Sequence, residues 1–189
     1  TLLLHTGLRR GELCGLEWDD INFDLSLLDV QRTSLYLPEK GVFVDETKNS
    51  TSRRVLKLTP DAVQLLKRYR MWQNSERLRI GDQWAEEWEQ RPRLFTTWDG
   101  KPLHPSTVTG WFHTFIERSD LPPISIHSLR HTNATLLIAA GTNLTTVAAR
   151  LGHANSTTTS KIYAHAIKSA EQAAAEVLQD ILHPVKKQA

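Results

Sequence analysis

The chain has 189 residues, of which 40% are hydrophobic; this length and composition fit one domain with a hydrophobic core and exclude a disordered chain. The formal net charge of +2 gives little reason by itself to expect a nucleic-acid partner. No apolar run approaches the roughly 20 residues that cross a bilayer, no secretory signal is visible, and the single cysteine, Cys14, cannot form a disulfide within the chain. We therefore expect a soluble, cytoplasmic protein with no membrane partner.

The first motif is the segment TGLRRGEL at residues 6–13, which is expected to begin a helix. Thr6 can cap this helix through its hydroxyl group. Arg9 and Glu12 are three residues apart, so their side chains can pair on one helical face. Arg10 points to a different side and is expected to lie on the surface.

Between Leu27 and Leu58 the hydrophobic period changes from that of a helix to that of a strand. Three stretches alternate between apolar and polar residues: 28–32, 42–44 and 54–58. Turn signals at 38–41 and 49–52 separate these stretches. The pattern predicts a three-stranded antiparallel sheet with Lys48 at the edge of the second hairpin, where a flexible tip can carry an ammonium group.

A competing motif occupies the same place. Glu46-Thr47-Lys48 has the Glu-x-Lys pattern found on strands of metal-dependent nucleases, which also need a second acid to hold Mg²⁺. Asp29, on the preceding predicted strand, is the only candidate for that acid. This alternative leaves the arginine motif and the motifs near the C-terminus unexplained.

The rest of the chain is mainly helical in pattern. Thr59, Pro60 and Asp61 supply a cap, a first-turn proline and a first-turn acid for a helix that continues toward Leu78. Further helices are expected at 105–116, 128–140, 144–151 and 168–182. The expected fold class is therefore α+β, a mainly helical domain with a small three-stranded antiparallel sheet.

The C-terminal third contains two motifs that suit phosphodiester chemistry. His127, Arg130 and His131 stand at i, i+3 and i+4, so all three side chains leave one face of a helix. Arginine presents a planar fork to two phosphate oxygens, and histidine can donate or shuttle a proton near neutral pH. His153 then follows a leucine and a glycine at a helix end, and Tyr163, ten residues later, is the candidate nucleophile.

With these motifs the chain resembles the tyrosine recombinase (phage integrase) family in its catalytic domain, from Thr6 to about Ala166. The resemblance assigns six catalytic residues: Arg9, Lys48, His127, Arg130, His153 and Tyr163. It also makes Glu12 the partner that orients Arg9, and it gives His131 a supporting role without contact to phosphate.

The resemblance implies site-specific cleavage and rejoining of double-stranded DNA at attachment sites, by an enzyme of a phage or mobile element. Tyr163 would form a 3′-phosphotyrosyl link, Arg9 and Arg130 would neutralise the phosphorane, and Lys48 would protonate the leaving 5′ oxygen. Strand exchange implies a homotetramer on two DNA sites, and no cofactor is required. The expected contacts to DNA phosphates are Arg10, Arg53 and Arg54.

Several alternatives stay open at this point. A type IB topoisomerase would use related tyrosine chemistry as a monomer, and a catalytically silent DNA-binding module would bind without cleaving. His127 and His131 have a spacing that suits zinc, but no cysteine or HExxH pattern completes a site, so no metal is expected.

The opening residues from Thr1 lack an initiator Met and read as the end of a helix already begun. We therefore expect a fragment of a longer protein from which the preceding DNA-binding domains are absent. The expected division is a catalytic domain at 1–166 and a helical tail at 167–189, which packs either on its own domain or on a neighbouring protomer.

Overall fold

The computed structural model describes residues 1–46 and 53–153 continuously, and residues 159–160, 163–164, 167, 171, 174–175, 177–179 and 182 in addition. The chain divides into two compact units, Thr1–Asn133 and Ala134–Ala189. Within the described residues, no helix combines the length and the apolar character needed to cross a membrane. The expected boundary at 166/167 between a catalytic domain and a tail is a separate division and stays a prediction.

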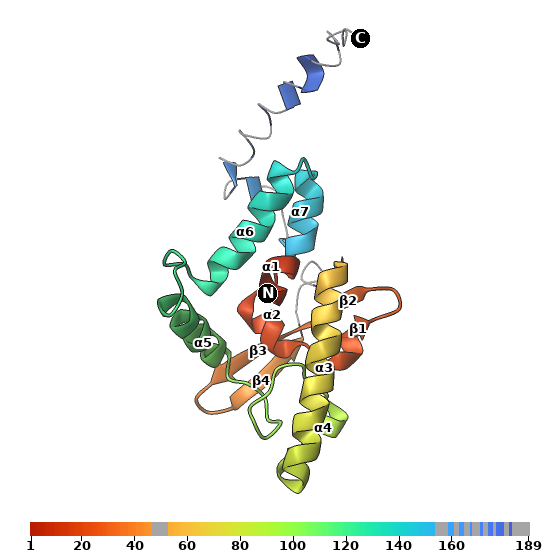
Figure 1. Ribbon diagram of the computed structural model, residues 1–189, viewed down its shortest axis with the longest axis vertical. Helices are drawn as coiled ribbons and strands as arrows, with labels where there is room; N and C mark the ends of the chain where they lie inside the picture. The colour runs from red at the N-terminus through yellow and green to blue at the C-terminus, as the bar shows by residue number, and fades with distance from the viewer. Residues whose placement is uncertain are drawn as a thin grey trace. The chain divides into compact units, whose positions relative to one another are not determined.

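The fold class is α+β, as the sequence predicts (Figure 1). The first unit contains α1 (Leu2–Thr6), α2 (Arg10–Gly15), η1 (Trp18–Asp20), β1 (Ile21–Asn22), β2 (Leu27–Val30), β3 (Arg32–Leu37), β4 (Gly41–Glu46), β5 (Arg54–Lys57), α3 (Pro60–Ile80), η2 (Gly81–Gln83), α4 (Glu87–Gln90) and α5 (Pro105–Glu117). Helix α6 (Ile126–Ala139) crosses the boundary between the units, and α7 (Leu144–Leu151) belongs to the second.

The small sheet has three antiparallel strands, but their identity differs from the prediction. The order is β1-β2-β5, and strands β3 and β4 form a separate two-stranded hairpin. The predicted strand at 28–32 is interrupted at Gln31, after two fully buried residues of β2, Leu28 and Val30. The hairpin leaves the core at this point, and β1 pairs with β2 through Ile21 and Leu28.

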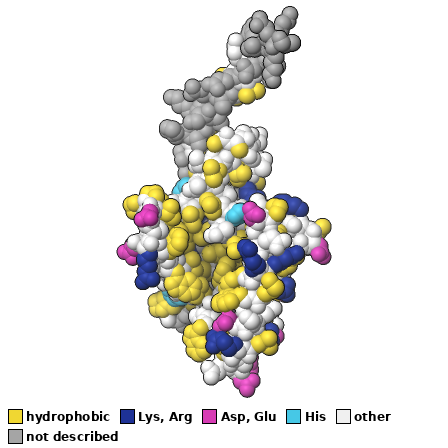
Figure 2. Space-filling model, in the orientation of Figure 1, with side chains coloured by type: hydrophobic (Ala, Val, Ile, Leu, Met, Phe, Trp, Pro, Cys, Tyr) yellow, Lys and Arg dark blue, Asp and Glu magenta, His cyan; other side chains and the backbone are white. Residues whose placement is uncertain are grey.

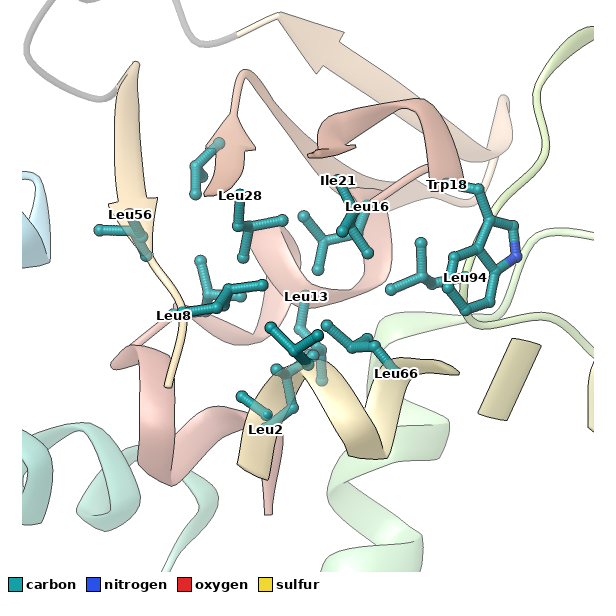
Figure 3. Packing of buried hydrophobic residues seen from close by; sticks show 14 of the residues in the cluster. Leu2, Leu8, Leu13, Leu16, Trp18, Ile21, Leu28, Leu56, Leu66 and Leu94 are labelled. Atoms are coloured by element: carbon teal, nitrogen blue, oxygen red, sulfur yellow. The ribbon is translucent and has the colours of Figure 1, made fainter. Parts of the chain in front are cut away.

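The core of the first unit joins helices α1, α2 and α3 to strands β2 and β5 (Figure 3). Leucines from helices, strands and the segments that join them dominate it; five of them are Leu8, Leu16, Leu28, Leu56 and Leu66. Removing one such side chain from water stabilises the fold by about 1.5–3 kcal/mol. This packing fixes α2, which contains part of the arginine motif at residues 6–13, and β5, which begins at Arg54.

Glycine at the end of helix α2 allows close approach to strand β3. A Cβ atom at Gly15 would lie 3.1 Å from the backbone nitrogen of Ser34 and 3.2 Å from the carbonyl oxygen of Arg32. Both neighbours are backbone atoms of a strand, so neither can move alone. Gly11, one turn earlier, would likewise meet Thr33.

We expect Gly15→Ala to destabilise the protein relative to a matched control. Overpacking costs about 1–3 kcal/mol, and the gain of about 1 kcal/mol that alanine makes over glycine in a helix applies to both sites. Gly110→Ala provides that control, because a Cβ there has no neighbour within 4 Å. Urea unfolding of both variants should place Gly15→Ala below Gly110→Ala by about 1–3 kcal/mol. Equal unfolding free energies would show that α2 does not pack as tightly as described.

Candidate active site

The arginine motif folds differently from the prediction, although it brings the predicted pair together. Thr6 is not a helix cap; it is the last residue of α1, and its Oγ1 donates to the carbonyl oxygen of Leu2 at 2.7 Å. Helix α2 begins at Arg10, with Arg9 as its N-cap. Glu12, in the first turn, reaches back to Arg9, because a carboxylate can accept the N–H groups that a helix start leaves unpaired.

Glu12 is the centre of a three-residue ion-pair cluster. Its Oε1 accepts from Arg9 Nη1 at 2.9 Å, and its Oε2 accepts from the backbone N–H of Arg9 at 2.8 Å. Arg54 adds two parallel hydrogen bonds, Nη1 to Oε1 at 3.0 Å and Nη2 to Oε2 at 2.8 Å. Burial raises the pKa of Glu12, but the hydrogen bonds and charges of Arg54 and Arg9 outweigh it, so the pKa lies below its ordinary value.

The role expected for Arg54 therefore needs correction. The side chain of Arg54 is only 7% exposed and is committed to Glu12, whereas a contact to the DNA backbone requires an accessible guanidinium. Arg9, at the other side of the same carboxylate, keeps 41% of its side chain exposed. Arg10 and Arg53 are exposed, and their expected contacts to DNA phosphates stay predictions.

Arg130 is buried and holds helix α6 against the C-terminal end of α1. It is 2% exposed, and its Nη1 donates to the carbonyl oxygen of Gly7 at 2.6 Å. Asn133, three residues later, donates to the carbonyl oxygen of Leu4 at 2.7 Å. Both carbonyls belong to the group that a helix end leaves without an intrahelical partner. Gly7 ends α1 with φ of 67°, a left-handed conformation that a residue with a Cβ adopts at a cost of about 1–2 kcal/mol.

His127 lies one turn before Arg130, with its ring against that of His131. The ring centroids are 4.6 Å apart and the planes meet at 88°. Burial lowers the pKa of His127, and the neighbouring charges of His131, Arg130 and Arg9 lower it further. The hydrogen bond from Arg130 to the carbonyl oxygen of Gly7, inside the motif at residues 6–13, brings the arginine motif and the helix α6 motif together within the first unit. The lowered pKa favours the neutral ring, which can accept one hydrogen bond while donating another.

We expect His127 to titrate below 6.5, its ordinary value, in an NMR titration of the ring signals. Because the pKa in the folded protein is lower than in the unfolded chain, the stability linked to the neutral ring is complete above pH 6.5 and is lost as the pH falls through the folded pKa. His131→Asn removes one neighbour that disfavours the imidazolium, so it should raise the pKa of His127. His104→Asn, which changes a histidine outside this group, should leave that pKa unchanged. A native midpoint at or above 6.5 would contradict this arrangement.

In the second unit, the predicted catalytic residues His153 and Tyr163 are both hydrogen-bonded to Thr159. Helix α7 ends at Gly152, and the backbone N–H of His153 donates to the carbonyl oxygen of Ala148 at 3.0 Å. His153 Nδ1 lies 2.8 Å from Thr159 Oγ1, which is fully buried. The backbone N–H of Tyr163 donates to the carbonyl oxygen of Thr159 at 3.0 Å. Thr159 thus connects the predicted histidine to the predicted nucleophile.

Tyr163 is packed in the hydrophobic core of the second unit and is 5% exposed. Its neighbours in this cluster come from helices α6 and α7: Ala134, Ile138, Val147 and Leu151. The ring is therefore largely shielded from solvent and packed among aliphatic side chains.

Lys48 lies outside the described residues, so its predicted role stays a prediction. The competing nuclease motif also includes Lys48, so it stays an alternative. Asp29 is on β2 of the three-stranded sheet, where its carboxylate accepts from Gln31 Nε2 at 2.8 Å, and Glu46 ends β4 of the separate hairpin. Over the described ranges, no group of three or more His, Cys, Asp or Glu residues is arranged to hold a metal ion.

A cavity of about 870 Å³ with mostly hydrophobic walls lies in the first unit, next to His127. Its walls come from α1, α5 and the start of α6, and they include Leu3, Phe112, Ile116 and His127. Arg10 borders the cavity and donates from Nη1 to Thr109 Oγ1 at 2.9 Å. Figure 2 shows hydrophobic side chains gathered on this face, over α5 and the β3–β4 hairpin.

Sequence reasoning missed the residues that hold the site rather than those expected to react. Gly7, Asn133 and Thr159 each accept or donate a hydrogen bond that fixes a predicted residue or its helix. Gly7 carries a recognisable signal, since a glycine after a short apolar run is typical of a helix C-terminus. Asn133 and Thr159 have no pattern of their own, because their partners are set by packing.

Comparison with known proteins gives a consistent result. The model of the phage integrase family matches residues 1–170. A tyrosine recombinase XerC-like protein of Caldanaerobacter subterraneus subsp. tengcongensis is 34% identical over 95% of this chain and 48% of its own length. The ICEBs1 integrase of Bacillus subtilis is 30% identical over 96% of this chain and 48% of its own length.

Among solved structures, the Tn1549 transposon integrase in complex with circular intermediate DNA superimposes with a TM-score of 0.73. It is 27% identical and covers 94% of this chain and 57% of its own chain. The chain spans about half the length of the curated relatives it matches. On the family match and the site geometry together, the chain belongs to the phage integrase family.

Proposed function

We propose that this chain is the catalytic part of a site-specific DNA recombinase of a phage or mobile element. The observation that carries the proposal is the hydrogen bond from Arg130 to Gly7, which brings Arg130, with His127 one turn before it, to the segment that carries Arg9. Two guanidinium groups and an imidazole suit a phosphodiester in transition. The names of the relatives support a recombinase or integrase, and the Tn1549 neighbour was solved with DNA.

In the proposed reaction, the phenol oxygen of Tyr163 attacks the phosphorus atom and the P–O5′ bond breaks. A free tyrosine has a pKa near ~10 and is a poor nucleophile at pH 7, so the site must remove its proton. His127 and His153 hydrogen-bond the phosphate or take this proton, and Arg9 and Arg130 neutralise the phosphorane.

The leaving 5′ oxygen gains a proton from Lys48, since an ammonium can release its proton where a guanidinium cannot. The product is a 3′-phosphotyrosyl link, which keeps the energy of the phosphodiester. A 5′-hydroxyl from a partner strand can therefore reverse the step and complete the exchange. His131 supports this site through its ring contact with His127.

The proposed partners are double-stranded DNA attachment sites and three further copies of the protein. Exchange of both strands between two sites needs one nucleophile for each of four cleavages, which a homotetramer on DNA supplies. Arg10 and Arg53 are exposed and contribute positive charge toward DNA phosphates. The proposed compartment is the cytoplasm, where a bacterial enzyme meets its DNA.

The test uses the full-length protein and DNA from the ends of its own element, nicked so that cleavage is trapped. The reaction runs in EDTA and is analysed on a denaturing gel. A DNA-dependent upward shift of the protein band is expected, because the phosphotyrosyl link survives denaturation. Free cut ends that appear only with Mg²⁺ would overturn the proposal in favour of a nuclease, and intact binding without any cleavage would favour a silent DNA-binding module.

A further inference from the structure

Arg54 has no part in the reaction above, yet its guanidinium is among the better buried charges of the described residues. We propose that Arg54 is a positioning residue for DNA cleavage, which fixes and neutralises Glu12 so that Arg9 meets the scissile phosphate as a net cation. This inference rests on the proposed function. It assigns a role to a side chain that acts on Arg9 through Glu12.

Arg54 changes the net charge of the group that contains Arg9 and Glu12. A carboxylate that accepts from Arg9 at 2.9 Å forms a neutral pair with it, and a neutral pair attracts a phosphate weakly. Arg54 adds a second positive charge to the same carboxylate, so the group of three carries a net charge of one positive unit. Arg9 is the member of the group whose charge is accessible to a phosphate. Its side chain is 41% exposed, whereas that of Glu12 is 2% exposed and that of Arg54 is 7% exposed.

Arg54 also fixes the orientation of the Glu12 carboxylate. The two parallel hydrogen bonds from Arg54 leave Glu12 a single orientation, since the planar fork matches both carboxylate oxygens at once. Arg9 adds a donor to each of these oxygens, one from its side chain and one from its backbone. Arg54 therefore orients the carboxylate of Glu12. The carboxylate in turn orients the side chain of Arg9 and holds the backbone at the start of α2.

The position of Arg54 is itself rigid. It is the first residue of β5 and lies opposite Val30, a fully buried residue of β2. Functional groups held by strands are placed more accurately than groups held by loops. A buried ion pair is weak evidence for a role in stability, because apolar residues of similar volume often stabilise as well. A role in placing Arg9 accounts for the pair better than stability does.

The experiment is a double-mutant cycle between Arg54→Met and Glu12→Gln in the full-length protein. Two quantities are measured on the nicked DNA in EDTA: the single-turnover cleavage rate at saturating DNA, and the Kd for DNA. Arg54→Met should slow cleavage by about 10- to 100-fold, as loss of a group that orients an active-site residue does. The Kd should change by less than about twofold, because Arg54 does not reach the DNA.

The cycle separates positioning from a general loss of charge. In the Glu12→Gln background, Arg54→Met should slow cleavage by less than about threefold further, since no carboxylate charge remains to be neutralised. Arg54→Lys keeps the charge but not the fork, so it should restore part of the rate. Arg68→Met, on the exposed face of α3, removes one positive charge elsewhere and should cleave at the native rate.

Three results would overturn the inference: native cleavage by Arg54→Met, a rise in Kd as the main effect, or a full Arg54 effect in the Glu12→Gln background. If Arg54→Met does not fold, Arg54→Lys and the double variant still give the comparison, because the double variant has no unpaired buried carboxylate. Absence of a covalent product with the native protein would instead overturn the proposed function, and this inference with it.

Discussion

Tyr163→Phe is expected to lower the rate of DNA strand cleavage by about 10⁴-fold or more, the size of effect that follows loss of a nucleophile. The substitution removes one oxygen atom and leaves the ring in the core formed with α6 and α7. The free energy of unfolding should therefore change by only about 1 kcal/mol. The covalent protein–DNA band should disappear, and the Kd for DNA should remain near the native value.

Tyr36→Phe serves as the matched control for this variant. Tyr36 is exposed on β3, and its ring is tilted against that of His104 with ring centroids 4.2 Å apart. The same change is thus made at a tyrosine that is not the predicted nucleophile. This control should form the covalent band at the native rate. If Tyr163→Phe also forms the band, a different residue carries the nucleophile and the assignment of Tyr163 is wrong.

Arg130→Lys is expected to reduce both cleavage and stability. Lysine keeps the charge but has no planar fork for two phosphate oxygens, so cleavage should fall by about 10²- to 10³-fold. Arg130 also donates to the carbonyl oxygen of Gly7 at 2.6 Å, and a buried carbonyl that loses its donor costs about 1–3 kcal/mol. Single-turnover cleavage and urea unfolding measure the two effects separately.

Asn133→Ala distinguishes chemistry from stability in this comparison. Asn133 lies one turn after Arg130 on the same helix and donates to Leu4 at 2.7 Å, so its loss should cost a similar free energy of unfolding. It has no proposed contact with phosphate, and cleavage at a temperature where both variants are folded should stay near native. Equal cleavage by the two variants would mean that Arg130 only holds α6 in place.

The contacts that the sequence predicts well are local ones. Arg9 and Glu12 are three residues apart, and helical geometry alone brings their side chains together. The same reasoning puts His127 beside His131, whose rings are in contact. The fold class was likewise predictable, because alternation and helical periodicity are properties of short segments.

The parts that were not predictable depend on distant segments. Arg54 is 42 residues from Glu12, and their contact requires the pairing of β5 with β2 and the packing of α2. Basic clusters in a sequence look alike whether they face a phosphate or a buried carboxylate. The membership of the sheet has the same origin, because alternation predicts a strand without naming its partner.

The hydrogen bonds of Thr159 limit where insertions can be accepted between His153 and Tyr163. Hydrogen bonds join Thr159 to His153 on one side and to Tyr163 on the other. An insertion on either side would displace one of these residues from the other, so evolution should leave this spacing short and uniform. The exposed 3-10 helix η2 (Gly81–Gln83) carries none of the predicted catalytic residues, and growth in divergent relatives is expected there instead.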